Sequence, residues 1–209
     1  MRKLITEFLG TFFLVLVIGM SVTTGKGDFA PIAIGSVLMV MIFAGAHISG
    51  AHYNPAVTLA VLMRGRITLR EGIPYIAVQI IGAIIAAALV NYLMPDKVLI
   101  ADNSLASAFK GLVAETLGTF ALAYVVLNVA TAKGTSGNMF YGLSIGFTVL
   151  SMAYAFGTVS SCAFNPAVAL GITVNNLIAW SDIWIYMLGC FGGAALAALV
   201  FRINNPLDK

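Results

Sequence analysis

Two short stretches of the sequence place an asparagine directly before a proline in apolar surroundings. They read "HYNPAVTLA" at residues 52–60 and "AFNPAVALG" at residues 163–171. Asparagine is among the preferred N-cap residues of helices, and proline suits the first helical position because it lacks an N–H. Each stretch therefore predicts a short helix that begins at the proline and is capped by the asparagine. Each asparagine side chain is a neutral amide, whose NH₂ group can donate hydrogen bonds to a nearby acceptor.

The composition excludes a soluble protein. Hydrophobic residues make up 60% of the 209 residues and charged residues only 9%, whereas a soluble domain carries about a quarter charged residues. The net charge of +3 is small and dispersed, so no nucleic-acid partner is expected. No phosphate-binding loop, nucleophile–base pair or metal-ligand cluster is apparent. We therefore expect no enzyme activity, no cofactor and no metal site.

Long apolar runs recur along the chain and predict an all-α membrane protein. A run of about 20 residues crosses roughly 30 Å of hydrocarbon at about 1.5 Å per residue. The two asparagine stretches are apolar for only about nine residues, so neither can span, and each predicts a re-entrant half-helix. Six transmembrane helices are predicted at about residues 4–24, 31–49, 72–93, 107–130, 138–158 and 181–203.

The loop charges predict that both termini are cytoplasmic, in a cell (plasma or inner) membrane. The basic start of the chain is typical of a signal peptide, but a sister copy lies mid-chain, so we interpret it as a first span. With the N-terminus inside, eight basic residues lie on the inner side and three on the outer side, as the positive-inside rule requires. The inner set is Arg2, Lys3, Arg64, Arg66, Arg70, Lys133, Arg202 and Lys209, and the outer set is Lys26, Lys97 and Lys110.

The chain is a single channel-like domain, 1–209, built from two similar halves. "TEFLGTFFLVLV" matches "AETLGTFALAYV" at an offset of 108 residues, the asparagines match at 111, and "GAIIAAALV" matches "GGAALAALV" at 110. We place repeat one at about 1–96 and repeat two at about 107–209. Because each half has three spans, the second half enters the bilayer inverted. Inverted repeats place the functional site at the midplane, between discontinuous helices.

Two half-helices that enter from opposite faces bring their N-termini together at the midplane. Each N-terminus carries roughly half a positive charge from the helix dipole, which opposes cations. The residues before each asparagine are small and polar, and bare carbonyls at this depth require a water-filled lumen. The carbonyls predicted to line the pore are those of Gly50, Ala51, His52, Ser160, Ser161 and Cys162.

On these residues the chain resembles the aquaporin family (major intrinsic proteins) over essentially its full length. The resemblance rests on "HISGAHYNPAVTLA", "FNPAVALG", the paired "E-x-x-G-T-F" starts and the internal repeat. It implies a homotetramer in the lipid bilayer, with one pore per subunit that passes water or small uncharged solutes. The two signature motifs of such a pore would be Asn54, Pro55 and Ala56, and Asn165, Pro166 and Ala167.

The chain departs from that family at the selectivity filter. Members usually carry an arginine three residues after the second asparagine, where this sequence has valine. Arginine presents fixed donors and a permanent charge, which valine lacks. We therefore expect a wider, uncharged filter that admits glycerol, urea, ammonia or neutral metalloid hydroxides. A water-dominated channel is the alternative. By spacing from the two asparagines, the filter residues are Ile34, Ala153, Cys162 and Val168.

Glu7 and Glu115 are the matched acids of the two halves, and buried acids in a membrane are candidates for function. As proton carriers they would indicate a proton-coupled secondary transporter. We favour a structural role, in which each carboxylate accepts hydrogen bonds from the N–H groups of the loop before a half-helix. A non-conducting scaffold is a third alternative, but it would not need the polar loops before the asparagines.

Overall fold

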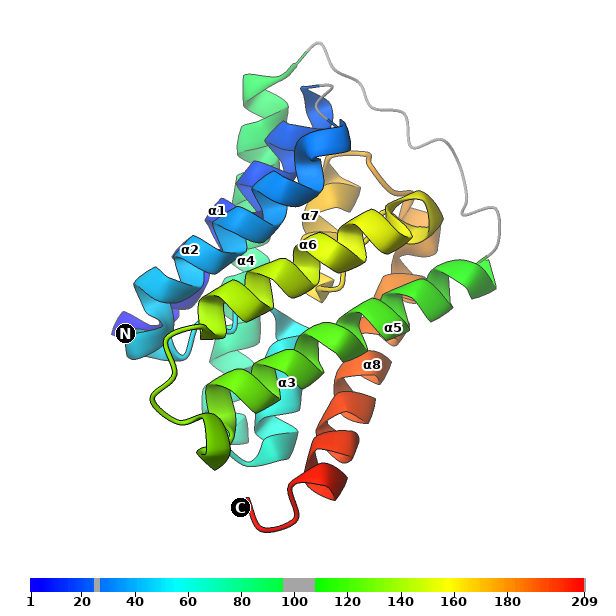
Figure 1. Ribbon diagram of the computed structural model, residues 1–209. Helices are drawn as coiled ribbons and strands as arrows, with labels where there is room; N and C mark the ends of the chain where they lie inside the picture. The colour runs from blue at the N-terminus through cyan, green and yellow to red at the C-terminus, as the bar shows by residue number, and fades with distance from the viewer. Residues whose placement is uncertain (25–26, 96–107, 209) are drawn as a thin grey trace.

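The computed structural model describes residues 1–24, 27–95 and 108–208, and the regular secondary structure of this part of the chain is helical (Figure 1). Six segments there are long and apolar enough to cross a membrane. The prediction of six spans and two short helices is thus confirmed. The α-helices of the described residues are α1 (Arg2–Thr23), α2 (Ala30–Ser49), α3 (Pro55–Arg64), α4 (Leu69–Leu93), α5 (Ala108–Val126), α6 (Tyr141–Ser160), α7 (Pro166–Val174) and α8 (Ile183–Asn204).

Short helical turns extend or link these helices. A π-helical turn, η2 (Leu127–Thr131), continues α5 toward the α5–α6 connection. The other turns are 3₁₀ segments: η1 (Gly27–Phe29), η3 (Lys133–Thr135) and η4 (Trp180–Asp182). The predicted boundary between the repeats, and Lys26, Lys97 and Lys209 of the charge count, lie outside the described residues.

Both short helices begin as the sequence predicts. The Asn54 Oδ1 accepts from the N–H groups of the second and third residues of α3, at 2.8 and 3.4 Å. The Asn165 Oδ1 does the same for α7, at 3.0 and 3.4 Å. Each cap satisfies donors that would otherwise be left bare at the start of a buried helix.

The two halves pack in the same way. Helix α1 packs against α2 and α4, and α5 packs against α6 and α8. Helices α2 and α6 cross where Gly35 and Gly146 meet, and a Cβ on either glycine would press on the other's carbonyl oxygen. The half-helices connect the halves, because α3 contacts α8 and α7 contacts α4. In Figure 1 they are the two short ribbons behind α5 and α6.

The last helix of each repeat corrects the predicted alignment by one residue. The Tyr75 hydroxyl donates to the Ser49 carbonyl at 2.9 Å, and the Tyr186 hydroxyl donates to the Ser160 carbonyl at 2.6 Å. The two tyrosine donors are 111 residues apart, and so are the two serine acceptors, whereas the sequence alignment predicts an offset of 110. Small apolar residues fill both helices, so their letters match almost equally well in two registers. Only the contacts of these helices fix which register is right.

Glycine contacts give the same register. A Cβ on Gly82 would lie 2.8 Å from the Phe8 carbonyl oxygen, and a Cβ on Gly193 would collide with the matching carbonyl of Thr116. A Cβ on Gly192, the partner expected from the sequence, would meet nothing within 4 Å. Gly82 therefore corresponds to Gly193. Small residues at these positions let neighbouring backbones approach closely.

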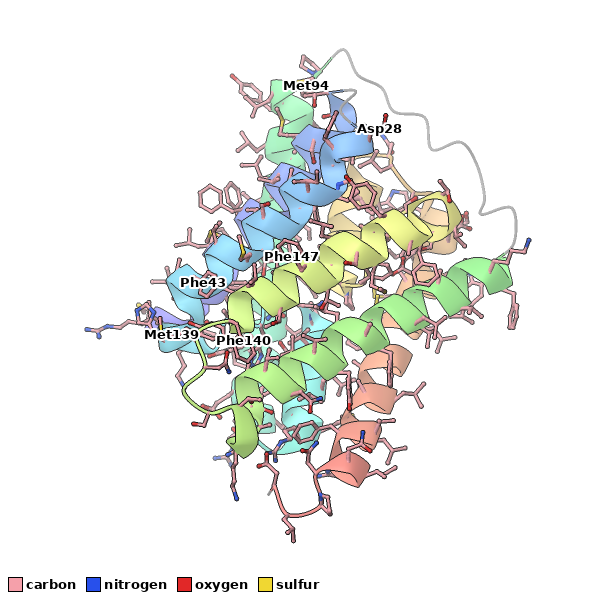
Figure 2. All side chains as sticks on the ribbon, in the orientation of Figure 1. Asp28, Phe43, Met94, Met139, Phe140 and Phe147 are labelled. Atoms are coloured by element: carbon pink, nitrogen blue, oxygen red, sulfur yellow. The ribbon has the colours of Figure 1, made fainter. Side chains whose placement is uncertain are left out.

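The outer surface of the bundle is apolar. Phe43 and Phe147, labelled in Figure 2 on α2 and α6, are 41% and 54% exposed. Large aliphatic side chains such as Ile81, Leu188 and Leu199 are also about half exposed. An apolar exterior of this kind suits contact with lipid rather than water.

Candidate functional site

The two asparagines hold the two re-entrant loops together at the centre of the molecule. The Asn54 Nδ2 donates to the Phe164 carbonyl at 2.9 Å, and the Asn165 Nδ2 donates to the Tyr53 carbonyl at 2.9 Å. The N-termini of α3 and α7 therefore meet, as the sequence predicts. Each amide Nδ2 carries two N–H groups. One N–H of each amide makes the bond across the centre, and the second is left for the cavity that both asparagines line.

The loops that lead into the asparagines run through left-handed backbone. Ala51 and Tyr53 have φ angles of 52° and 51°, and Cys162 and Phe164 have 53° and 48°. For residues other than glycine this conformation costs about 1–2 kcal/mol each. Such a conformation persists only where its surroundings hold it in place.

The two buried glutamates, Glu7 and Glu115, stabilise this loop backbone by accepting hydrogen bonds from its N–H groups. The Glu7 carboxylate accepts from the backbone N–H groups of His52 and Tyr53 at 3.0 and 2.7 Å, and from the Ser49 hydroxyl at 2.6 Å. Glu7 is fully buried. Its placement is the one predicted for a structural acid, because its oxygens bind the loop and not the cavity.

The second glutamate repeats the arrangement. The Glu115 carboxylate accepts from the N–H groups of Ala163 and Phe164 at 3.1 and 2.7 Å, and from the Ser160 hydroxyl at 2.7 Å. The halves differ in the remaining donor. In repeat one the Gln79 amide donates to Glu7 at 2.8 Å. The equivalent position in repeat two, at the offset of 111 residues, is Cys190, whose thiol lies 3.6 Å from Glu115. A thiol is a weak donor, so repeat two holds its acid less firmly.

A narrow cavity passes between the two asparagines. Its volume is about 30 Å³, space for about two water molecules. No lysine, arginine, aspartate or glutamate lines it within the described part of the chain. The wall is formed by Leu14, Ile18, Ile34, Leu38, Ile42, Ala51, His52, Tyr53, Asn54, Val57, Leu122, Val126, Ile145, Val149, Cys162, Ala163, Asn165 and Val168.

Three of the four predicted filter residues share this wall. Ile34, Cys162 and Val168 line the cavity. Ala153 does not, although it is close: its carbonyl oxygen lies 3.8 Å from the Cys162 Sγ. Val168 is 2% exposed and sits in the first turn of α7, where its N–H donates to the Asn165 cap.

The predicted pore carbonyls divide into three groups. Ala51, His52 and Cys162 line the cavity, whereas Gly50 and Ser161 are exposed residues at the ends of α2 and α6, outside the cavity wall. The prediction for Ser160 is wrong. Its carbonyl accepts the Tyr186 hydroxyl and its side chain donates to the buried Glu115, so the whole residue is turned into the protein. The loop turns toward the pore only after the helix has ended.

Sequence reasoning missed the aromatic residues directly before the asparagines. Tyr53 and Phe164 are fully buried, and their rings lie against Gly10 and Gly118, where a Cβ would collide with each ring. The signal was present, because both aromatic residues and both glycines occur at matched positions of the repeat. Most of the aliphatic wall carries no such signal, because its members resemble the lipid-facing residues of the same helices.

Comparison with known proteins agrees with this geometry. A protein-family model described as Major intrinsic protein matches residues 1–201. A curated relative, "Glycerol uptake facilitator protein-like 6" of Lactiplantibacillus plantarum, is 36% identical over the whole of both chains. "Aquaporin NIP1-1" of Zea mays is 34% identical over the whole of this chain and 78% of its own.

A solved structure shows the same fold. The aquaglyceroporin from Plasmodium falciparum superposes with a TM-score of 0.80, covering 99% of this chain and 97% of its own at 23% identity. The six spans, the paired half-helices and the family match agree with one another. The chain belongs to the major intrinsic protein family, whose members are membrane channels and not enzymes.

Proposed function

We propose that this channel passes small uncharged solutes (glycerol, urea, ammonia or neutral metalloid hydroxides) together with water. The observation that supports this choice is the uncharged wall at Val168. In its first-turn position an arginine would project donors and a fixed positive charge into the passage. Valine leaves an apolar surface that does not favour water over a solute with its own carbon skeleton. One relative is named as a glycerol uptake facilitator, which is consistent with the proposal.

In this mechanism passage needs no covalent step and no energy source. A solute exchanges hydrogen bonds with water for bonds to the free N–H groups of Asn54 and Asn165, and for bonds to loop carbonyls at Ala51 and His52. A cation meets the positive ends of α3 and α7 instead. The barrier to ions in this channel would rest mainly on these two helix ends.

A water-dominated channel is the second candidate, and the small cavity favours it. A volume of about 30 Å³ holds about two waters, so a glycerol molecule would have to displace wall side chains. The wall there is formed by aliphatic residues such as Ile34, Val149 and Val168, whose rotamers can change. Solute flux measurements separate the two candidates.

A proton-coupled transporter is disfavoured. Both carboxylates are engaged by donors of the protein, and neither Glu7 nor Glu115 lines the cavity. A proton carrier needs contact with the solute path. The passage proposed here has no such group within the described residues.

For the assembly we propose a homotetramer in a cell membrane, with both termini cytoplasmic. The even number of candidate spans, six, supports a location of both termini on one side of the bilayer. The excess of basic residues on that side supports the cytoplasmic assignment. Accessibility of tags at the two termini in intact cells tests the orientation, and cross-linking in the membrane tests the subunit number.

The deciding experiment is stopped-flow light scattering on proteoliposomes with the native protein and Val168→Arg. We expect the native protein to re-swell with glycerol or urea, and the arginine variant to pass mainly water. Val57→Thr, in the first turn of α3, is the matched control, because it changes a lining residue without adding a charge. If the native protein passes water alone, the water-dominated candidate is correct and the proposed filter is not.

A further inference from the structure

A buried ion pair lies at the end of α3 that is distant from the pore centre. The Arg64 Nη2 lies 2.6 Å from the Asp208 Oδ1, and the two side chains are only 3% and 10% exposed. The guanidinium also stacks over the Phe201 ring of α8, 4.8 Å from its centroid. Its Nε has no hydrogen-bond partner among the described residues. The charge of Arg64 therefore depends on one carboxylate.

That carboxylate connects three segments that are far apart in sequence. Besides Arg64 at the end of α3, it accepts from the backbone N–H of Lys133, in η3, at 2.7 Å. Arg66, just after α3, reaches the same carboxylate at 3.4 Å and donates to the Thr131 carbonyl at 3.2 Å. The segment after α8 thus holds the α5–α6 connection against the end of the half-helix.

We propose that Asp208 and Arg64 are a remote positioning pair for the pore centre. Helix α3 has ten residues and is about 15 Å long. A rod this short transmits a shift of one end to the other. Its first end carries Asn54, whose side chain donates across the centre to Phe164. Fixing Arg64 therefore fixes the amide that meets the solute.

The end of the other half-helix, α7, is anchored by neutral hydrogen bonds, whereas the end of α3 is anchored by an ion pair. Asn175, the residue that matches Arg64 at the offset of 111, lies at the end of α7. Its Nδ2 donates to the Ala87 carbonyl at 2.8 Å and to the Asn91 Oδ1 at 2.7 Å, both on α4. Helix α7 is thus held by a neighbouring span. The end of α3 packs against α8 as well, but its charged last residue, Arg64, pairs with a carboxylate on the segment after α8.

Loss of the carboxylate has a specific consequence. A buried guanidinium without its partner is strongly unfavourable, more so than the absence of both charges. In Asp208→Asn, Arg64 would therefore turn out toward water and draw the end of α3 with it. Replacing Arg64 by an apolar residue in the same protein removes the unpaired charge and with it the cause of the shift.

The test uses three variants and measures water permeability per assembled channel, so that loss of folded protein does not enter the result. Asp208→Asn should lower this unit permeability at least threefold. The double variant Asp208→Asn with Arg64→Met should recover most of it. Arg66→Met is the matched control. It removes an arginine from the same carboxylate, but one whose side chain is 39% exposed, and it should leave the unit permeability unchanged.

Two outcomes would overturn the proposal. One is a native unit permeability in Asp208→Asn. The other is a double variant no better than the single one, which would mean that Asp208 acts through Lys133 and not through Arg64. If Asp208→Asn does not assemble, the double variant still decides, because recovery of an assembled, permeable channel supports the pair and failure to recover rejects it.

Discussion

At the residue scale, the channel depends on a few polar groups that each have an assigned partner. The Asn54 oxygen caps α3 and its nitrogen reaches across the centre. The oxygens of Glu7 hold the backbone that presents this asparagine. Buried polar groups are stable only when they are paired in this way. Substitutions at these residues should therefore affect folding before they affect selectivity.

Glu115→Gln should destabilise the fold by about 2–3 kcal/mol, because a buried N–H loses its charged acceptor. The N–H groups of Ala163 and Phe164 would face a neutral amide in place of the carboxylate. Thermal unfolding in detergent measures the loss. Any protein that remains folded should conduct independently of a proton gradient. If the native protein requires a proton gradient to conduct and the Glu115→Gln variant does not, Glu115 is instead a proton carrier.

Ser161→Gly should stabilise the protein by about 0.5–1 kcal/mol, because the native φ of 62° is unfavourable for serine and not for glycine. Its equivalent in repeat one is Gly50, with a φ of 88°. The reverse substitution, Gly50→Ser, should destabilise by a similar amount. Denaturant unfolding of both variants gives the comparison. Equal and unchanged stabilities would show that the backbone relaxes at these helix ends.

At the element scale, helix-to-loop contacts set the path of the re-entrant segments. Each loop aromatic lies on a glycine of the first helix in its repeat, Tyr53 on Gly10 and Phe164 on Gly118. The two glycines leave room for these rings, so a side chain at either position must displace the loop. Both rings are fully buried, so close packing leaves them little space into which to move.

Gly118→Ala should therefore lower stability by about 1–3 kcal/mol, the usual effect of overpacking. The new methyl group would collide with the Phe164 ring. Gly192→Ala is the control: its Cβ would meet nothing within 4 Å, and alanine favours the helix by about 1 kcal/mol. Melting temperatures should move in opposite directions. A Gly118→Ala protein as stable as the native one would show that the ring can move without cost.

At the scale of the whole molecule, segments distant in sequence are joined at the end where α3 terminates. The carboxyl of Asp208 is the junction. The Lys133 backbone N–H, and then the charge of Arg64, hold the pKa of this carboxyl below its usual range. The junction is therefore ionised throughout the neutral range, and ordinary changes of pH do not release it.

The pH dependence has a definite sign. Because the folded pKa of Asp208 is lowered, its contribution to stability is present above the unfolded value, about 3.9. It is lost as the pH falls through the folded pKa. Unfolding of the native protein and of Asp208→Asn should thus differ by a constant amount from pH 5 to 8, and the two should converge at lower pH. A difference that disappears between pH 6 and 7 would point to another titrating group.

The sequence predicted features that depend on local pattern. Span lengths, the half-helices and their caps follow from apolar runs and from the Asn-Pro pairs. The register of α8 could not be read, because a run of small residues such as Gly192 and Gly193 matches itself at neighbouring offsets. The turned-in Ser160 and the Asp208 junction were also missed. Both depend on long-range contacts, which leave no periodic trace in one sequence.

The exchange of hydrogen bonds between the two loops also bears on how the chain is made. Asn54 finds its acceptor 110 residues later, at Phe164, and Asn165 finds its acceptor 112 residues earlier, at Tyr53. While synthesis has delivered only the first half to the bilayer, that half has a polar amide at its centre with no acceptor from its counterpart. Neither half can complete the centre by itself. We therefore expect biogenesis to end with a cooperative closure, in which the second loop enters the membrane and both halves become native together.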